Sequence, residues 1–147
     1  MLDTNGDLPG GVHFQFAYAY TDAFAANSIL EPDFGKLVGA GAPLLNIPKH
    51  NASLLLSKDF QVAQRTLTFG GTVKYVSRRL GETGTEFFLP SYTLVNLNAS
   101  YQLTDHLELS AQVRNVFNKE YYPASYATLW VLPGEPREYL ARITYRY

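Results

Sequence analysis

Apolar and polar residues alternate along most of this chain, and that period of two constrains its fold more than any other feature. In one segment the apolar residues Val12, Phe14, Phe16, Tyr18 and Tyr20 occupy every second position. Because successive side chains of a β-strand point to opposite faces, the pattern predicts strands with one apolar face and one mostly polar face. Six segments follow it, and strands are expected over about residues 11–21, 49–60, 65–77, 92–103, 106–116 and 137–147.

The connections between these segments alternate strictly in length. Residues 61–65 and 104–106 form short connections, whereas residues 21–50, 78–91 and 116–137 form long ones. In an antiparallel meander, this alternation places every short turn at one end of the sheet and every long loop at the other. The sequence therefore predicts an all-β, antiparallel meander of six strands whose two ends differ in chemistry.

Three features favour membrane-spanning strands over a soluble sandwich or lipocalin-like barrel, which would also alternate. The first is loop asymmetry, because outer-membrane barrels have short periplasmic turns and long external loops. The second is strand length, since about 9–12 residues suit a tilted crossing of about 25 Å of hydrocarbon. The third is the placement of aromatic rings at both strand ends, which matches the girdles at the two membrane interfaces. These rings are Tyr18, Tyr20 and Tyr75 at one end and Phe60, Tyr101, Tyr145 and Tyr147 at the other.

The membrane interpretation has two consequences. Six strands leave two unpaired edges, and each unpaired backbone group costs several kcal/mol in lipid. The smallest usual barrel has about 8 strands, so this chain is expected to be part of a longer one. The alternative is a barrel closed by several chains. The alternating apolar positions would face lipid, and Lys58 is the one charged residue among them.

The composition argues against several classes of protein. Of the 147 residues, 46% are hydrophobic and 17% are charged, which is unlike a disordered segment. A net charge of −1 argues against a nucleic-acid partner, which would require a cationic face. The absence of cysteine removes disulfides, thiolate metal sites and cysteine nucleophiles. The sequence contains no run of about 18 apolar residues, so no transmembrane helix is predicted.

No catalytic motif is present. The chain has neither the G-x-S-x-G pattern of hydrolases nor the H-E-x-x-H pattern of zinc peptidases. The three histidines, His13, His50 and His106, lie at separate strand ends, so a shared metal site is not expected. We therefore predict a protein that is not an enzyme and has no cofactor.

The last third of the chain resembles a known family. The segment Asn115–Tyr122, with the sequence N-V-F-N-K-E-Y-Y, is similar to a pattern near the end of TonB-dependent outer-membrane receptors. The P-G-E-P-R segment Pro133–Arg137 resembles the pattern before their last strand. Residues 141–147 resemble their closing strand, although the last residue, Tyr147, stands where Phe is usual. With Pro48–Asn51 before the second strand, the chain looks like the siderophore-receptor branch of this family.

The resemblance implies the fold and the function. The family forms a 22-stranded barrel in the outer membrane of Gram-negative bacteria, with a plug domain in its lumen. By this resemblance the chain supplies the last six strands, and Asn5–Gly11 forms the short periplasmic turn before them. The signal peptide, the plug and the segment that contacts TonB are expected to be absent from the chain. The implied function is TonB-dependent import of a ferric siderophore, and import of a vitamin, haem or sugar, or a soluble ligand-binding β-sandwich, stays open.

Ligand contacts are expected from the long loops. Ferric siderophores are often anionic and carry aromatic or hydroxamate groups, to which arginine offers charge and aromatic rings offer flat contact area. The same rings could instead belong to the outer girdle or pack the loops. The candidates are Arg78, Arg79, Phe87, Phe88, Tyr121, Tyr122, Tyr126 and Trp130.

Two further groups of residues have expected roles. Charged residues on the polar face would contact the plug of the same full-length chain or form a solvated, mutually neutralising lumen wall. The resemblance also implies that the final strand is recognised by the barrel-assembly machinery, and its aromatic residues could equally form an ordinary girdle. The charged residues are Lys74, Glu108, Arg114, Glu138, Arg142 and Arg146, and the final-strand residues are Ile143, Tyr145 and Tyr147. Expected partners are outer-membrane lipid and, through the missing N-terminal part, TonB.

Overall fold

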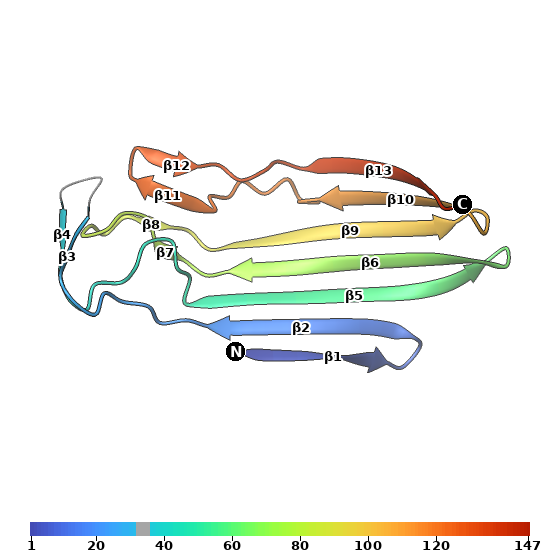
Figure 1. Ribbon diagram of the computed structural model, residues 1–147, viewed down its shortest axis with the longest axis horizontal. Coiled ribbons are helices and arrows are strands. Elements are labelled where there is room, and N and C mark those ends of the chain that lie inside the picture. The colour runs from blue at the N-terminus through green and yellow to red at the C-terminus, as the bar shows by residue number, and fades with distance from the viewer. Residues whose placement is uncertain (32–35) are drawn as a thin grey trace.

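One antiparallel sheet dominates the computed structural model, which describes residues 1–31 and 36–147 (Figure 1). Seven strands follow one another across it in chain order, and each pairs with the next. The strands are β1 (Leu2–Leu8), β2 (Val12–Tyr20), β5 (His50–Val62), β6 (Arg65–Val76), β9 (Tyr92–Gln102), β10 (Leu107–Arg114) and β13 (Glu138–Tyr145). The all-β, antiparallel meander predicted from alternation is confirmed.

Six of these strands begin and end within two residues of the ranges predicted from alternation. The exception is the N-terminal segment, where the prediction of a turn over Asn5–Gly11 is wrong. Residues Leu2–Leu8 form β1 and pair along their whole length with β2, and only residues 9–11 turn. Gly10 and Gly11 adopt φ values of 87° and 74°, which L side chains rarely adopt. The polar residues of β1 do not alternate with apolar ones, so only the pairing with β2 identifies this segment as a strand.

Three small hairpins form in the long loops, all at the same end of the sheet (Figure 1, left). The short turns lie at the opposite end, as the alternation of connection lengths predicts. The hairpins are β3 (Ile29–Glu31) with β4 (Lys36–Val38), β7 (Arg79–Leu80) with β8 (Phe88–Leu89), and β11 (Ala124–Ala127) with β12 (Trp130–Leu132).

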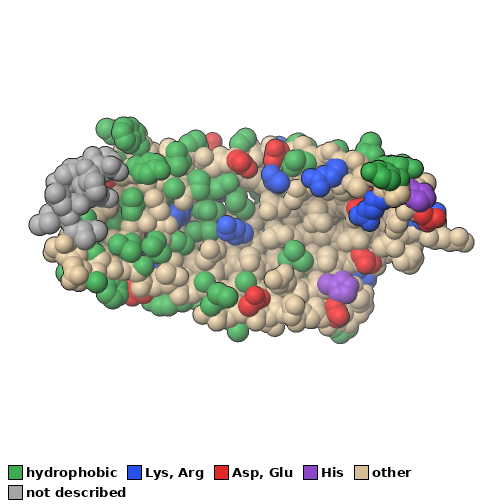
Figure 2. Space-filling view, viewed as in Figure 1, with side chains coloured by type: hydrophobic (Ala, Val, Ile, Leu, Met, Phe, Trp, Pro, Cys, Tyr) green, Lys and Arg blue, Asp and Glu red, His purple; other side chains and the backbone are tan. Residues whose placement is uncertain are grey.

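The sheet is a single layer with one apolar and one polar face. The register places Phe16, Leu54, Val73 and Val95 in one row across four strands on the apolar face. Val73 remains 39% exposed, because no second layer of the described residues covers this face. Figure 2 shows the other face, where polar and charged side chains cover the strands and hydrophobic side chains gather over the loops.

Burial is concentrated at the loop end. The buried hydrophobic residues among those described are Ala25, Val38, Val76, Leu80 and Leu89, and all lie in or beside the long loops. A soluble sandwich would instead bury Leu54, Leu97 and Leu109, yet Leu109 is 37% exposed and the other two are half-buried. The described residues also contain no helix long and apolar enough to span a membrane.

Candidate functional site

The three long loops are joined by hydrogen bonds around Asn46 and Ser125. The Asn46 side chain accepts a hydrogen bond from the Ser125 amide at 3.0 Å and donates one to the Ser125 carbonyl at 2.7 Å. The Asn46 amide donates to the Leu80 carbonyl at 2.9 Å, and the Ser125 hydroxyl donates to the Gly81 carbonyl. Ser125 is fully buried. We call Asn46, Leu80, Gly81 and Ser125 the loop hub, since they tie residues of all three loops into one unit.

Arg79 anchors the second loop to the third. Its guanidinium donates to the carbonyl of Pro123 at 3.2 Å and to that of Tyr122, and it lies 5.2 Å from the centre of the Tyr92 ring. The side chain is buried, and burial lowers the pKa of its guanidinium. One nitrogen, Nη1, is buried without a hydrogen-bond partner among the described residues. Arg79 therefore holds the backbone of the third loop from a position enclosed by the loops.

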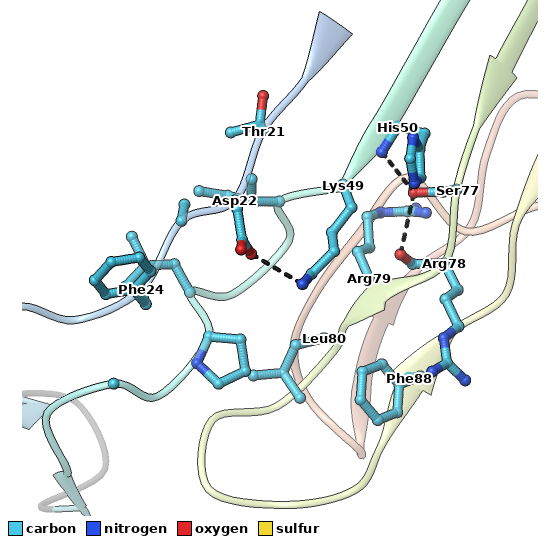
Figure 3. Close-up of a pocket in the computed structure, with 15 residues that line it drawn as sticks. Thr21, Asp22, Phe24, Lys49, His50, Ser77, Arg78, Arg79, Leu80 and Phe88 are labelled. Carbon is cyan, nitrogen blue, oxygen red and sulfur yellow. Dashed lines mark hydrogen bonds and ion pairs between the residues drawn. The ribbon is translucent and has the colours of Figure 1, made fainter.

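A cavity of about 620 Å³ opens beside Arg79, between the first and second long loops (Figure 3). Lys49 and Asp22 face each other in it with a separation of 2.9 Å, and the Asp22 carboxylate raises the pKa of the Lys49 ammonium. The Arg78 guanidinium lies 5.1 Å from the centre of the Phe88 ring. The cavity thus combines cationic donors with apolar and aromatic surface, including Phe24, Leu80 and Phe88.

Of the eight residues predicted to contact the ligand, some line the cavity and the others lie elsewhere in the loops. Arg78, Arg79 and Phe88 line the cavity together. Phe87 packs its ring against Gly81, where an added Cβ would lie 2.6 Å from it. Tyr121 contacts the Tyr92 ring with centroids 4.7 Å apart. Neither of these two lines the cavity, and nor do the remaining three. The Tyr122 carbonyl accepts a hydrogen bond from Arg79, and Tyr126 and Trp130, which are 59% and 65% exposed, lie on the β11–β12 hairpin.

Sequence reasoning missed Asp22, Phe24 and Lys49 as cavity residues. They lie in the first long loop, where no local pattern separates them from neighbouring loop residues. The Lys49–Asp22 ion pair and the loop hub bring them opposite Arg78 and Arg79. Only the three-dimensional pairing of the loops identifies them.

The N-V-F-N-K segment forms the base of the last long loop. Asn115 is buried, with a φ of 46°. Its side-chain nitrogen, Nδ2, donates hydrogen bonds to the carbonyls of Lys119 and Glu135 at 2.9 and 3.1 Å. Its side-chain oxygen, Oδ1, accepts a hydrogen bond from the backbone amide of Lys119 at 2.8 Å. Asn118 accepts a hydrogen bond from the Arg137 amide at 2.9 Å. Both asparagines therefore join the beginning of the loop to its end.

The P-G-E-P-R segment completes this closure. The Gly134 amide donates to the Tyr121 carbonyl at 2.7 Å, and an added Cβ at Gly134 would lie 2.3 Å from the Tyr121 ring. Only glycine allows that close approach. The two motifs that resemble the receptor family thus have a structural reason for their composition.

The six predicted lumen residues differ in their pairing. Arg114 lies 3.2 Å from Glu138, and Arg146 lies 3.4 Å from Glu108, so these four neutralise one another. By register Lys74 lies opposite Ser53 and Leu94, and Arg142 lies opposite Ser110. Neither Lys74 nor Arg142 has an ion-pair partner in the part of the chain that the structure describes.

The final strand is exposed to the surroundings, and the histidines form no metal site among the described residues. Ile143, Tyr145 and Tyr147 are all more than half exposed on or just after β13, which is the last strand of the sheet. Within residues 1–31 and 36–147, no three His, Asp or Glu side chains are grouped to hold a metal ion. His50 instead contacts the Tyr18 hydroxyl at 2.8 Å.

Known proteins resemble this chain in sequence and in fold. A family model described as "TonB dependent receptor-like, beta-barrel" matches residues 2–116. The metal-pseudopaline receptor CntO of Pseudomonas aeruginosa is 36% identical over 148 residues, which cover 99% of this chain and 20% of that protein. The chain therefore spans about a fifth of the length of this relative.

Two solved structures share the fold. The siderophore receptor PiuA from Acinetobacter baumannii matches with a TM-score of 0.79 at 22% identity, over 99% of this chain and 21% of that one. The ferric preacinetobactin receptor BauA from the same species matches with a TM-score of 0.77 at 26% identity, over 97% of this chain and 21% of that one.

Proposed function

This chain belongs to the TonB-dependent receptor family, and on that premise we propose that it forms the C-terminal strands of a receptor that imports a ferric siderophore. The family resemblance carried by the sequence motifs is confirmed. The protein is an outer-membrane protein of Gram-negative bacteria, and its family consists of receptors and transporters rather than enzymes. Import is a property of the whole receptor, of which this chain is a part.

The cavity beside Arg79 is the observation that carries the proposal. It lies at the long-loop end, which faces the outside in outer-membrane barrels. Arg78 offers a charged donor fork beside the Phe88 ring, and Lys49 and Arg79 also line the cavity. An anionic chelate with flat groups suits this combination, because arginine binds carboxylate and similar oxygens while aromatic rings supply contact area.

A second ligand is favoured by sequence similarity. The relative that is 36% identical across 99% of the chain is a metal-pseudopaline receptor, so a metal chelate of that kind is an alternative to a ferric siderophore. Vitamins, haem and sugars remain less favoured alternatives. All of these ligands would enter from the loop end.

The remaining assignments follow from the receptor premise. We propose that a longer chain closes the barrel, with 22 strands as the family resemblance implies, since β1 and β13 each pair on one side only among the described residues. Lys74 and Arg142 are the best candidates for plug contacts, because the other four predicted lumen residues form ion pairs with one another. TonB would act through the plug, and the barrel-assembly machinery would recognise Ile143, Tyr145 and Tyr147.

Metal uptake by the full-length receptor tests the proposal. Cells that depend on this receptor are given a siderophore loaded with radioactive iron, or pseudopaline loaded with a radioactive metal ion. The change Arg78→Ala should weaken binding of the imported chelate about tenfold, as for loss of one charged hydrogen bond. Arg65→Ala, at the opposite end of the sheet, serves as the matched control. Unchanged uptake by Arg78→Ala would reject the cavity as the ligand site.

A further inference from the structure

An apolar groove crosses the middle of the lipid-facing side of the sheet. It has a volume of about 320 Å³ and lies over β2, β5, β6 and β9. Its floor is Gly71, which the register places between Leu56 and Leu97 and which offers no side chain to fill the row. The walls are Leu54, Leu56, Phe69, Val73, Val95 and Leu97.

Lys58 lies at the short-turn end of this groove. It is the one charged residue among the alternating apolar positions, and it lies opposite Val12 and Phe69 in the register. Its ammonium is 5.2 Å from the centre of the Phe60 ring and would be 3.9 Å from a Cβ at Gly10 in the β1–β2 turn. Nζ therefore lies at the level of a periplasmic turn, beside an aromatic ring of the inner girdle.

The charge of Lys58 is uncompensated by the described residues. Its side chain is half-buried, and none of the ion pairs among residues 1–31 and 36–147 includes it. A cation on a lipid-facing strand is unfavourable unless its head reaches the interface and meets an anion. Phosphate groups of phospholipids provide that anion at this level of the periplasmic leaflet.

The length of the groove matches one leaflet. Leu54 lies four residues before Lys58, which corresponds to about 13 Å along an extended strand and to about 10 Å along the membrane normal for a strand tilted by about 40°. The apolar band of an outer-membrane barrel is about 25 Å tall, so the groove spans most of the half of that band that belongs to the inner leaflet. We propose that one phospholipid of the periplasmic leaflet binds here, with its phosphate on Lys58 and an acyl chain in the groove over Gly71.

Native mass spectrometry of the full-length receptor tests this proposal. Delipidated receptor is titrated with dioleoylphosphatidylglycerol, and the bound lipid is counted. Lys58→Gln should weaken retention of one lipid about fivefold, as expected for one interfacial cation, whereas Lys58→Arg should retain it. Gly71→Val, which fills the groove, should lower retention by a similar factor.

The controls separate lipid binding from folding. Gly6→Val lies on the same face but outside the groove, and a Cβ there meets Phe14 at 3.1 Å, as one at Gly71 meets Leu97. It should leave lipid retention unchanged, and heat-modifiable migration on a gel should show that all variants fold. Retention by both Lys58→Gln and Gly71→Val at the wild-type level would overturn the proposal. So would equal retention of dioleoylglycerol, which has no phosphate.

Discussion

The strands and the long loops of this protein are stabilised by different interactions. Along the strands, large apolar side chains such as Phe69 and Val73 remain 48% and 39% exposed on an uncovered face. In the loops, Leu89 and Ser125 are fully buried, and side chains such as Asn46 and Arg79 satisfy the backbone of distant segments. The strands depend on membrane lipid to cover their apolar face, whereas the loops bury apolar side chains in a small core of their own.

This difference determines how each region responds to substitution. A change on a strand has its effect through the face to which it points, because lipid lies on one side and the lumen on the other. A change in the loops has its effect through one or two hydrogen bonds that join segments far apart in sequence. Substitutions that separate these effects test whether the strands and the loops are stabilised independently.

The largest effect is expected for a charge on the lipid face. Leu56→Lys places a cation on the lipid face in the row of Gly71, near the middle of the apolar band and four residues from Phe60, and it should destabilise the full-length barrel by about 3 kcal/mol. Leu55→Lys, one residue earlier, points to the polar face opposite Gln15 and Thr72, and it should cost less than about 0.5 kcal/mol. Urea unfolding in detergent or lipid vesicles measures both. Equal costs would mean that the two faces meet the same surroundings.

Loss of the loop hub should have the next largest effect. Asn46→Ala removes two side-chain hydrogen bonds to the buried backbone of Ser125 and places alanine at a φ of 60°, for a cost of about 2 kcal/mol. Hydrogen exchange should increase around residues 79–82 and 124–127 while the strands stay protected. Asn46→Gly removes the same hydrogen bonds without the backbone strain, so it should show most of the increase. Faster exchange throughout β5 and β6 would contradict a separate loop unit.

The same contrast explains which parts of the molecule the sequence could predict. Alternation is a local signal, so it located six strands to within two residues, and the register followed from the apolar face. It failed at Leu2–Leu8, where Asn5, Gly6 and Asp7 indicate a turn and only pairing with β2 makes a strand. The cavity residues Asp22 and Lys49 were not predictable, because a hydrogen bond between Asn46 and Leu80, which lie in different loops, helps to bring them opposite Arg79.

A smaller effect is expected where the last loop closes. Gly134→Val would force the Tyr121 ring to move, because an added Cβ lies 2.3 Å from it. Since a loop relaxes more readily than a packed core, the cost should be about 1–2 kcal/mol, and it should appear as local exchange around residues 119–137. The control is Gly39→Val in the first long loop, where a Cβ meets nothing within 4 Å and no change is expected. If the two variants behave alike, Gly134 has no special packing role.

The smallest effect should come from the short-turn end, where Arg65 donates a hydrogen bond to Asp105. That hydrogen bond lowers the pKa of the exposed Asp105 carboxyl. A carboxyl with a lowered pKa in the folded state stabilises that state above its ordinary pKa of about 4, and the contribution is lost as the pH falls through the folded value. Asp105→Asn should therefore lower the melting temperature slightly at about pH 7, and the difference from wild type should vanish at about pH 2. Arg65→Gln should reproduce this profile, because it removes the same pair from the other side. A deficit that persists unchanged at low pH would assign the effect to turn geometry instead of charge.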